Sequence, residues 1–225
     1  MDRTVQDALV LRIDGGQPIC AETVLELGNW CERAEDAGPG AVAVVTVAGT
    51  PGPNWTDGLT IGLVSKWERS VRRLERLPLP TIGVAVGDCG GTALDAYLAT
   101  DYRIADRSLR LHLPAAADGS WPGMALYRLA NRGGSGAAIR RAALFGKPLD
   151  AQDAVALQLI DEVAVDVSDA LTAAIALAAS VGEGHAIRRR LMLDAIYIGF
   201  EEALGTHLAA CDRSLRMSQA QEEPS

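Results

Sequence analysis

The pattern of apolar and polar positions divides the chain into two halves of different character. In the first half, short apolar runs rich in β-branched residues predict strands at 8–14, 41–49 and 81–86. Between them, apolar residues recur at helical spacing, which predicts helices at 19–38 and 59–77. This alternation of strands and helices predicts an α/β fold with an at least partly parallel sheet.

The second half is dominated by Ala-rich segments. After two short strand-like runs, "YRIAD" and "LRLHL", the spacing predicts helices at about 124–131, 135–145, 151–157, 168–181 and 186–217. No linker-like composition separates the halves. We therefore expect one domain over 1–225, with a core at about 1–165, a helical region at about 166–217 and a polar tail at 218–225.

Composition and charge narrow the class of protein. The chain is 48% hydrophobic and 22% charged, which is ordinary for a soluble globular protein. Its net charge of −8 argues against nucleic acid and anionic membranes as partners. No apolar run approaches the roughly 20 residues that span a bilayer. The acidic N-terminus does not predict a signal peptide, and four scattered cysteines without CxxC spacing favour a reduced, cytoplasmic protein.

The junction between the strand at 81–86 and the following segment carries the most suggestive chemistry. Gly90 and Gly91 precede a helix-compatible stretch, and glycine lets backbone approach a ligand closely. The first amides of a helix lack intrahelical partners and can polarise a carbonyl oxygen. Asp95 shares a helix face with Thr92, so its carboxylate could move a proton beside that carbonyl.

A structural role competes with this interpretation. Thr92-x-x-Asp95 also fits a capping box, in which each side chain accepts from the other's backbone amide. Spacing alone favours the capping box over catalysis. A second strand-to-helix loop, 53–62 with Gly58 at its turn, could bring another amide to the same oxygen, although by itself it is an ordinary connection.

Four segments in order resemble a known family. They are "VVTVAG…NWTDGL", "LPLPTIGVAVGDCGGTALDAYLATDYRIAD", "LHLPAAADGSWPG" and "LFGKPLDAQDAVALQLIDEV". Together they are similar to the crotonase superfamily of enoyl-CoA hydratases and isomerases, from about Val42 to Val163. The resemblance implies a crotonase-like spiral of strand-strand-helix repeats with a helical C-terminal region, a homotrimer or hexamer, and an acyl-CoA thioester as substrate. It implies no cofactor, because CoA is part of the substrate.

The resemblance also implies roles for individual residues. In this family two backbone amides hold the thioester oxygen, and here they would be those of Leu59, after Gly58, and Thr92, after Gly91. Asp95 falls where hydratases place the first of two catalytic glutamates. These positions are therefore the expected oxyanion hole, substrate-binding turns and proton-transfer group.

The sequence departs from the family pattern at the second glutamate. That residue normally follows a proline, but here Pro114 is followed by Ala115. Asp118 and Ser120 lie close by in sequence and are candidates to contact substrate in its place. Asp95 is also one methylene shorter than glutamate, which matters because catalytic geometry tolerates little displacement.

Within the superfamily, the missing glutamate and short C-terminus are most similar to the small accessory hydratase of dihydroxyphenylglycine biosynthesis in glycopeptide antibiotic pathways. That similarity implies a role beside a type III polyketide synthase in forming 3,5-dihydroxyphenylacetyl-CoA. The alternative is a crotonase fold that serves the synthase as a catalytically weak or inactive partner. An isomerase or decarboxylase that uses only the oxyanion amides is a third option.

Other chemistries are not supported by the residues. His112, His185 and His207 do not pair with cysteines or acids at metal-ligand spacing, so no metal site is predicted. "GGSGA" misses the GxSxG elbow by one residue, and Cys89 is better explained as a small buried thiol.

Basic residues form two groups that could meet the phosphates of CoA. Their alternative is a solvated or interface face, with acidic residues between them. The first group is a stripe at Lys66, Arg69, Arg72, Arg73 and Arg76, and the second is Arg128, Arg132, Arg140 and Arg141.

Overall fold

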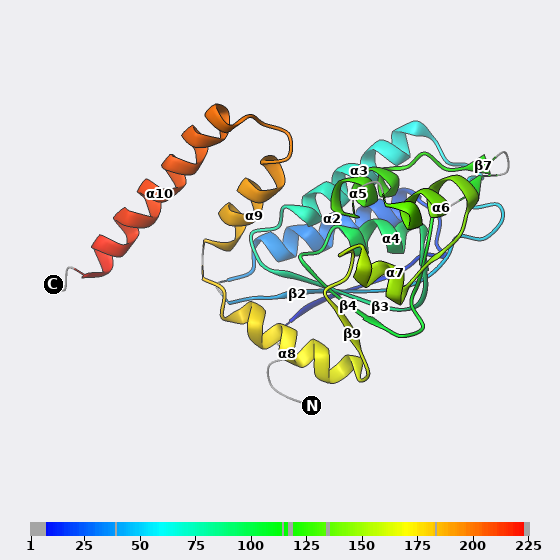
Figure 1. Ribbon diagram of the computed structural model, residues 1–225, viewed down its shortest axis with the longest axis horizontal. Coiled ribbons are helices and arrows are strands. Elements are labelled where there is room, and N and C mark those ends of the chain that lie inside the picture. Colours follow the sequence, from blue (N-terminus) through cyan, green and yellow to red (C-terminus); the bar gives the residue numbers. More distant parts are fainter. Residues whose placement is uncertain are drawn as a thin grey trace.

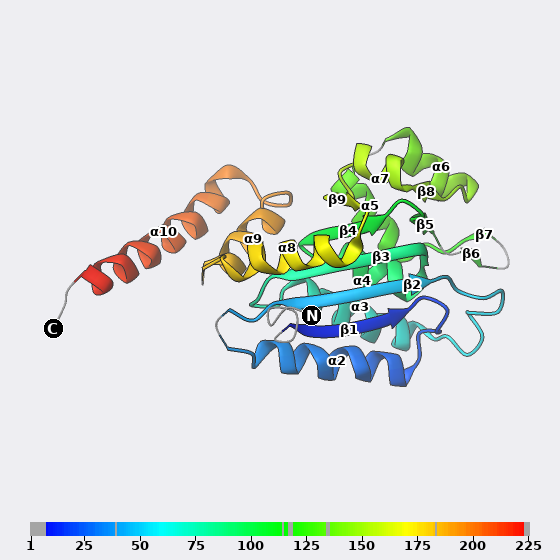
Figure 2. The same ribbon diagram turned by 90° about the horizontal axis from the view of Figure 1, so that it is seen from below.

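The fold is a parallel sheet with helices on both faces, and it confirms the predicted α/β class. The computed structural model describes residues 8–38, 40–113, 115–116, 119–133, 136–182 and 184–222. The central strands, all parallel, run in the spatial order β1 (Leu9–Asp14), β2 (Ala43–Gly49), β3 (Thr81–Gly90), β4 (Tyr102–Asp106) and β9 (Glu162–Ala164). Figure 2 shows these strands side by side.

Two apolar cores form because successive strand residues point to opposite faces. Val45 of β2 packs into the core on the face of the sheet that α2 (Ala21–Glu35), α3 (Ile61–Glu75) and α4 (Gly91–Leu98) cover. Its neighbour Val44 packs into the core on the opposite face, which α8 (Val167–Ala179) covers. Figure 1 shows α2, α3 and α4 above the sheet and α8 below it.

β3 is longer than its apolar run indicates. The predicted strand ended at residue 86, but β3 continues to Gly90 through Gly87, which has a φ of 70°. The extension exists because Asp88–Gly90 pair in parallel with β5 (Arg110–His112). The strand therefore delivers its glycines directly to the start of α4.

Short strands accompany the long ones and were not predicted. β6 (Ala115–Ala116) and β7 (Gly119–Ser120) form an antiparallel pair, and β8 (Leu149–Asp150) pairs antiparallel with β5. Two or three residues carry too little periodicity to be distinguished from loop.

The C-terminal helices follow the predictions with one correction. α5 (Met124–Gly133), α6 (Ala137–Phe145), α7 (Ala151–Ala156) and α8 lie within about two residues of the predicted bounds. The single helix predicted at 186–217 is wrong, because α9 (His185–Asp194) and α10 (Phe200–Glu222) are separate. α10 also runs five residues into the segment that was predicted as a tail from 218.

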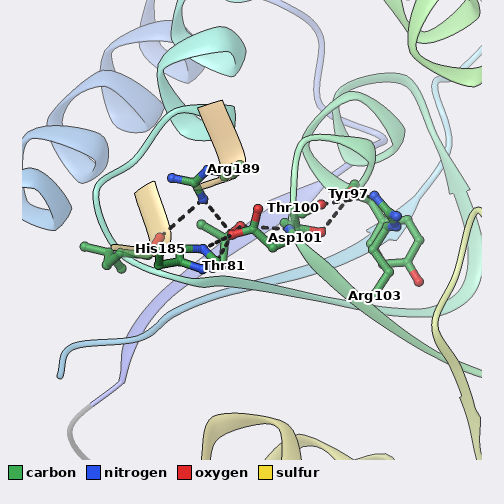
Figure 3. A network of polar contacts seen from close by, with 8 residues as sticks. Thr81, Tyr97, Thr100, Asp101, Arg103, His185 and Arg189 are labelled. Carbon is green, nitrogen blue, oxygen red and sulfur yellow. Dashed lines mark hydrogen bonds and ion pairs between the residues drawn. The ribbon is translucent and has the colours of Figure 1, made fainter. Parts of the chain in front are cut away.

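The last two helices differ in how they attach to the body. α9 is held by an ion pair between Arg76 and Asp194 at 3.1 Å and by the polar contacts of Asp101 with His185 and Arg189 (Figure 3). α10 projects away from the body (Figure 1). Within the described ranges, no helix combines the length and the apolar character that crossing a membrane requires.

Candidate active site

The turn from β3 into α4 is built around Gly91. Its φ of 54° lies in the left-handed region, and a Cβ there would lie 2.5 Å from Cγ of Pro51. Any side chain at 91 would therefore collide with the loop that follows β2. The absent side chain lets the two strand-to-helix loops meet at the start of α4.

A small cavity lies at this meeting point. Its volume is about 20 Å³, which is room for about one water molecule. Trp55 and Trp121 enclose part of it in an edge-to-face arrangement, with ring centroids 5.1 Å apart. The full lining is Gln17, Ile19, Pro51, Trp55, Gly91, Thr92, Asp95, Leu113, Trp121, Gly123 and Ala125.

Asp95 is directed into the interior rather than back to the helix start. The N-cap of α4 is Gly90, and the Thr92 hydroxyl donates to the carbonyl oxygen of Asp14 at 3.2 Å. The Asp95 carboxylate instead accepts a 2.9 Å hydrogen bond from Nε1 of Trp67. The capping box that spacing favoured is therefore wrong, because tertiary partners take both side chains.

A buried arginine also faces Asp95. Arg128 of α5 places a guanidinium nitrogen 3.5 Å from Oδ1 of Asp95 and donates to Glu68 of α3 at 2.8 Å. Its side chain is only 6% exposed, so the interpretation of Arg128 as part of a solvated face is wrong. The missed signal is spacing: 125, 128 and 129 share one face of α5, and Ala125 and Leu129 are buried.

These surroundings set the proton affinity of Asp95. Burial raises the pKa of Asp95 because it disfavours the charged form, and the negative charge of Glu68 raises it further. Arg128 and the Trp67 hydrogen bond act in the opposite direction, and the resulting pKa is about 7. A carboxyl with this pKa can both take and give a proton near neutral pH.

The structure brings some of the predicted residues together and leaves others apart. Gly91, Thr92 and Asp95 line the same cavity. Gly58, with a φ of 73°, is exposed, and the Leu59 amide donates to the Thr56 carbonyl oxygen at 3.0 Å. Neither Gly58 nor Leu59 lines the cavity, so the Leu59 amide could bind an acyl oxygen only after this turn opens.

The segment of the missing glutamate lies beside the cavity. Leu113 and Trp121, which flank the β6–β7 pair, both line it. Ala115 pairs with Ser120 across that hairpin, but the Ser120 side chain and all of Asp118 lie outside the described residues. Their predicted contacts with substrate stay predictions.

A larger cavity adjoins the small one. It has a volume of about 520 Å³, runs along β1 and β2, and shares Gln17 and Thr92 with the cavity at Asp95. This size is typical of cavities that take small-molecule ligands. It provides space for an extended substrate whose reacting end reaches α4.

Most of the basic stripe on α3 is occupied by ion pairs. Arg73 pairs with Glu35 of α2 at 2.5 Å, Arg72 pairs with Glu75, and Arg76 pairs with Asp194 of α9. These contacts favour the solvated or interface face over phosphate binding. No group of three or more His, Cys, Asp or Glu side chains that could hold a metal ion occurs within the described part of the chain.

The arrangement of strands and helices is that of crotonase-type proteins. Two solved structures share the fold: an enoyl-CoA hydratase of Shewanella pealeana, 19% identical, has a TM-score of 0.75 and covers 95% of this chain and 85% of its own. A Thermobifida fusca protein solved in complex with acetoacetyl-CoA, 20% identical, has a TM-score of 0.74 and covers 94% and 93%.

Sequence similarity then gives the family. The enoyl-CoA hydratase/isomerase family model matches residues 61–224. A protein of Amycolatopsis orientalis with the name "Enoyl-CoA-hydratase" is 50% identical over 209 residues, which cover 92% of this chain and 96% of that protein. The chain therefore belongs to the enoyl-CoA hydratase/isomerase family, as the sequence resemblance implied.

Proposed function

We propose that the protein is an enoyl-CoA hydratase-like lyase that acts on an acyl-CoA thioester with Asp95 as its proton-transfer group. One observation carries the proposal: the buried Asp95 carboxyl lines the same cavity as the first residues of α4, and burial raises its pKa toward the neutral range. Family membership and the acyl-CoA complex of the Thermobifida protein support the substrate class.

The start of α4 supplies the electrophilic part of the site. The amide of Thr92 belongs to the first turn, where N–H groups have no intrahelical partner and the helix dipole is positive. A thioester oxygen that accepts from this amide is stabilised as an enolate. We propose the Leu59 amide as the second donor, released from Thr56 when substrate binds.

Asp95 then carries the proton in both directions. For hydration, its carboxylate takes a proton from one water molecule, and the resulting hydroxide adds to the β-carbon. The electron pair of the double bond moves to the thioester oxygen, and protonated Asp95 returns its proton to the α-carbon. Dehydration is the reverse, and one carboxyl suffices because it alternates between base and acid.

The acyl group and partner form the finer part of the proposal. We propose that the protein assists a type III polyketide synthase in dehydrating an intermediate on the way to 3,5-dihydroxyphenylacetyl-CoA, as a homotrimer or hexamer. The replacement of the second glutamate by Ala115 supports this assignment.

The loss of conjugated enoyl-thioester absorbance tests the reaction. Wild type should consume short enoyl-CoA substrates, and Asp95→Asn should lower kcat by about 10² to 10⁴-fold, because it removes general acid–base transfer. Asp212→Asn, which alters an exposed ion pair on α10, is the matched control and should behave as wild type. Equal activity of Asp95→Asn and wild type would rule out Asp95 as the proton-transfer group.

A non-catalytic partner role is the second candidate. It is favoured by the occupied Leu59 amide and by the closed cavity of about 20 Å³ under Trp55 and Trp121. In that case the protein should raise the product yield of an added polyketide synthase, and Asp95→Asn should raise it equally. Hydratase activity without the synthase, lost in Asp95→Asn, would exclude this role.

A further inference from the structure

Asp95 shares its counter-ion with a second carboxylate. The Arg128 guanidinium lies between Asp95 on α4 and Glu68 on α3, so three elements contribute one charged group each. All three side chains are largely buried, with exposed fractions of 6% for Arg128, 11% for Asp95 and 19% for Glu68. The cluster therefore holds two acids and one base in a weakly solvated setting.

The two carboxylates do not share Arg128 equally. Glu68 accepts a hydrogen bond of 2.8 Å, whereas the nitrogen facing Asp95 is 3.5 Å away and has no hydrogen-bond partner among the residues that the structure describes. A buried guanidinium nitrogen without a hydrogen-bond partner lowers the stability of the fold, and Asp95 is an acceptor that this nitrogen could reach by a small movement. The observed arrangement thus keeps Arg128 engaged with Glu68 and short of a full ion pair with Asp95.

Glu68 itself does not reach the small cavity. It lines a separate cavity of about 570 Å³ between α3, α5 and α9, and the two cavities have no described lining residue in common. Arg128 lines that second cavity as well, while Asp95 does not. Glu68 is consequently placed to act through Arg128 and not on the substrate.

We propose that Glu68 is a positioning residue: it holds Arg128 away from full ion pairing with Asp95, so that Asp95 can exchange its proton during turnover. The inference rests on the proposed function of Asp95. Without Glu68, Arg128 is free to bind Asp95 in a bidentate pair, which would hold the carboxyl ionised.

Few other groups among the described residues act on the charge of Asp95. Trp67 of α3 donates a hydrogen bond, which favours the ionised form. Cys89 of β3 is fully buried, and burial together with the Asp95 charge raises the pKa of its thiol, so it stays uncharged at neutral pH. The charges that govern Asp95 are therefore those of Glu68 and Arg128.

The test is the titration of Asp95 itself, followed by carboxyl ¹³C NMR with the resonance assigned through Asp95→Asn. In Glu68→Gln, the midpoint should fall by about one pH unit or more, because a repelling charge is lost and Arg128 moves toward Asp95. In Arg128→Met it should rise, because the attracting charge is lost. Glu68→Asp, which keeps the charge, should stay nearer to wild type than Glu68→Gln.

Kinetics give a second measurement of the same effect. The limb of the pH–rate profile that Asp95 governs should move to lower pH in Glu68→Gln by the shift seen in the NMR titration. Glu35→Gln removes a glutamate from another Glu–Arg pair, that of Glu35 with Arg73, and should leave the limb in place.

The outcomes separate this inference from the proposed function. An unchanged Asp95 midpoint in a folded Glu68→Gln protein overturns the positioning role, whether or not the protein is active. A midpoint that falls, in a protein without enoyl-CoA activity, supports the control of Asp95 by Glu68 and contradicts the proposed reaction. If Glu68→Gln does not fold, an unchanged midpoint in Arg128→Met overturns the role.

Discussion

Two aspartates, the buried Asp95 within α4 and the half-buried Asp101 just after it, have opposite electrostatic surroundings. Burial alone would raise the pKa of Asp101, but hydrogen bonds and charge from its partners lower it below its ordinary value. Its Oδ2 accepts from Thr81 N at 3.0 Å, Thr81 Oγ1 at 2.9 Å, His185 at 3.2 Å and Arg189 at 2.6 Å. Figure 3 shows these groups converging on Asp101.

Asp95 has fewer partners that offset the effect of burial on its charge. Within the described part of the chain it accepts one side-chain hydrogen bond, from Trp67, and it shares its arginine with Glu68. Its side chain is 11% exposed against 22% for Asp101, a modest difference beside the difference in donors. Asp101 and its donors Thr81, His185 and Arg189 therefore form a structural contact, called the clamp below, in which the carboxylate stays ionised. Asp95 shares its positively charged partner with Glu68, and its carboxyl can therefore change protonation state.

Removing the clamp should have the largest effect on stability. Asp101→Ala leaves the buried Arg189 without its carboxylate, so we expect the free energy of unfolding to fall by about 3 to 5 kcal/mol. Denaturant unfolding measures this. Asp212→Ala, at an exposed ion pair, should cost less than about 1 kcal/mol. A similar small cost for Asp101→Ala would contradict the clamp.

Removal of the carboxylate at Asp95 should raise the free energy of unfolding rather than lower it. Its folded pKa of about 7 lies above its ordinary value of 3.8, so ionised Asp95 costs stability as pH rises through that window. Asp95→Asn should therefore be more stable than wild type at pH 8, by on the order of 4 kcal/mol, and equal to it near pH 4. Thermal unfolding across pH measures the difference. A variant less stable than wild type at pH 8 would show that ionised Asp95 stabilises the fold.

Loss of one donor from the clamp should have the smallest effect. In His185→Ala, Asp101 keeps Arg189 and both Thr81 donors, so the expected cost is about 1.5 kcal/mol, the value of one hydrogen bond to a charged group. Denaturant unfolding should place this variant between wild type and Asp101→Ala. A loss of unfolding free energy as large as that of Asp101→Ala would mean that Asp101 depends mainly on His185, and not on its donors together.

The regular elements could be predicted because their signals are local. The apolar run at 41–49 became β2, and the spacing of Trp67, Val71 and Leu74 became the buried face of α3. The break between α9 and α10 was missed, although Gly199 directly before α10 is a residue that commonly interrupts helices. The extension of β3 was missed because it depends on pairing with β5.

The candidate site was predicted only in part, for the same reason. Asp95, Thr92 and Gly91 were identified by resemblance, and the structure brings them to one cavity. Spacing favoured a capping box, because it cannot show that Trp67 and Asp14 offer the two side chains better partners. Arg128 was assigned to a surface group, although its place beside Ala125 and Leu129 on α5 indicated burial.

By itself, the sequence determined the alternation of strands and helices, the family, and the acid that follows the glycine turn. These depend on nearest neighbours along the chain and on the order of motifs. The tertiary structure alone decided which of two aspartates is clamped and which shares its counter-ion. Partners such as Glu68 and Arg128, sixty residues apart, meet only when α3, α4 and α5 pack together, and charge interactions depend on that distance.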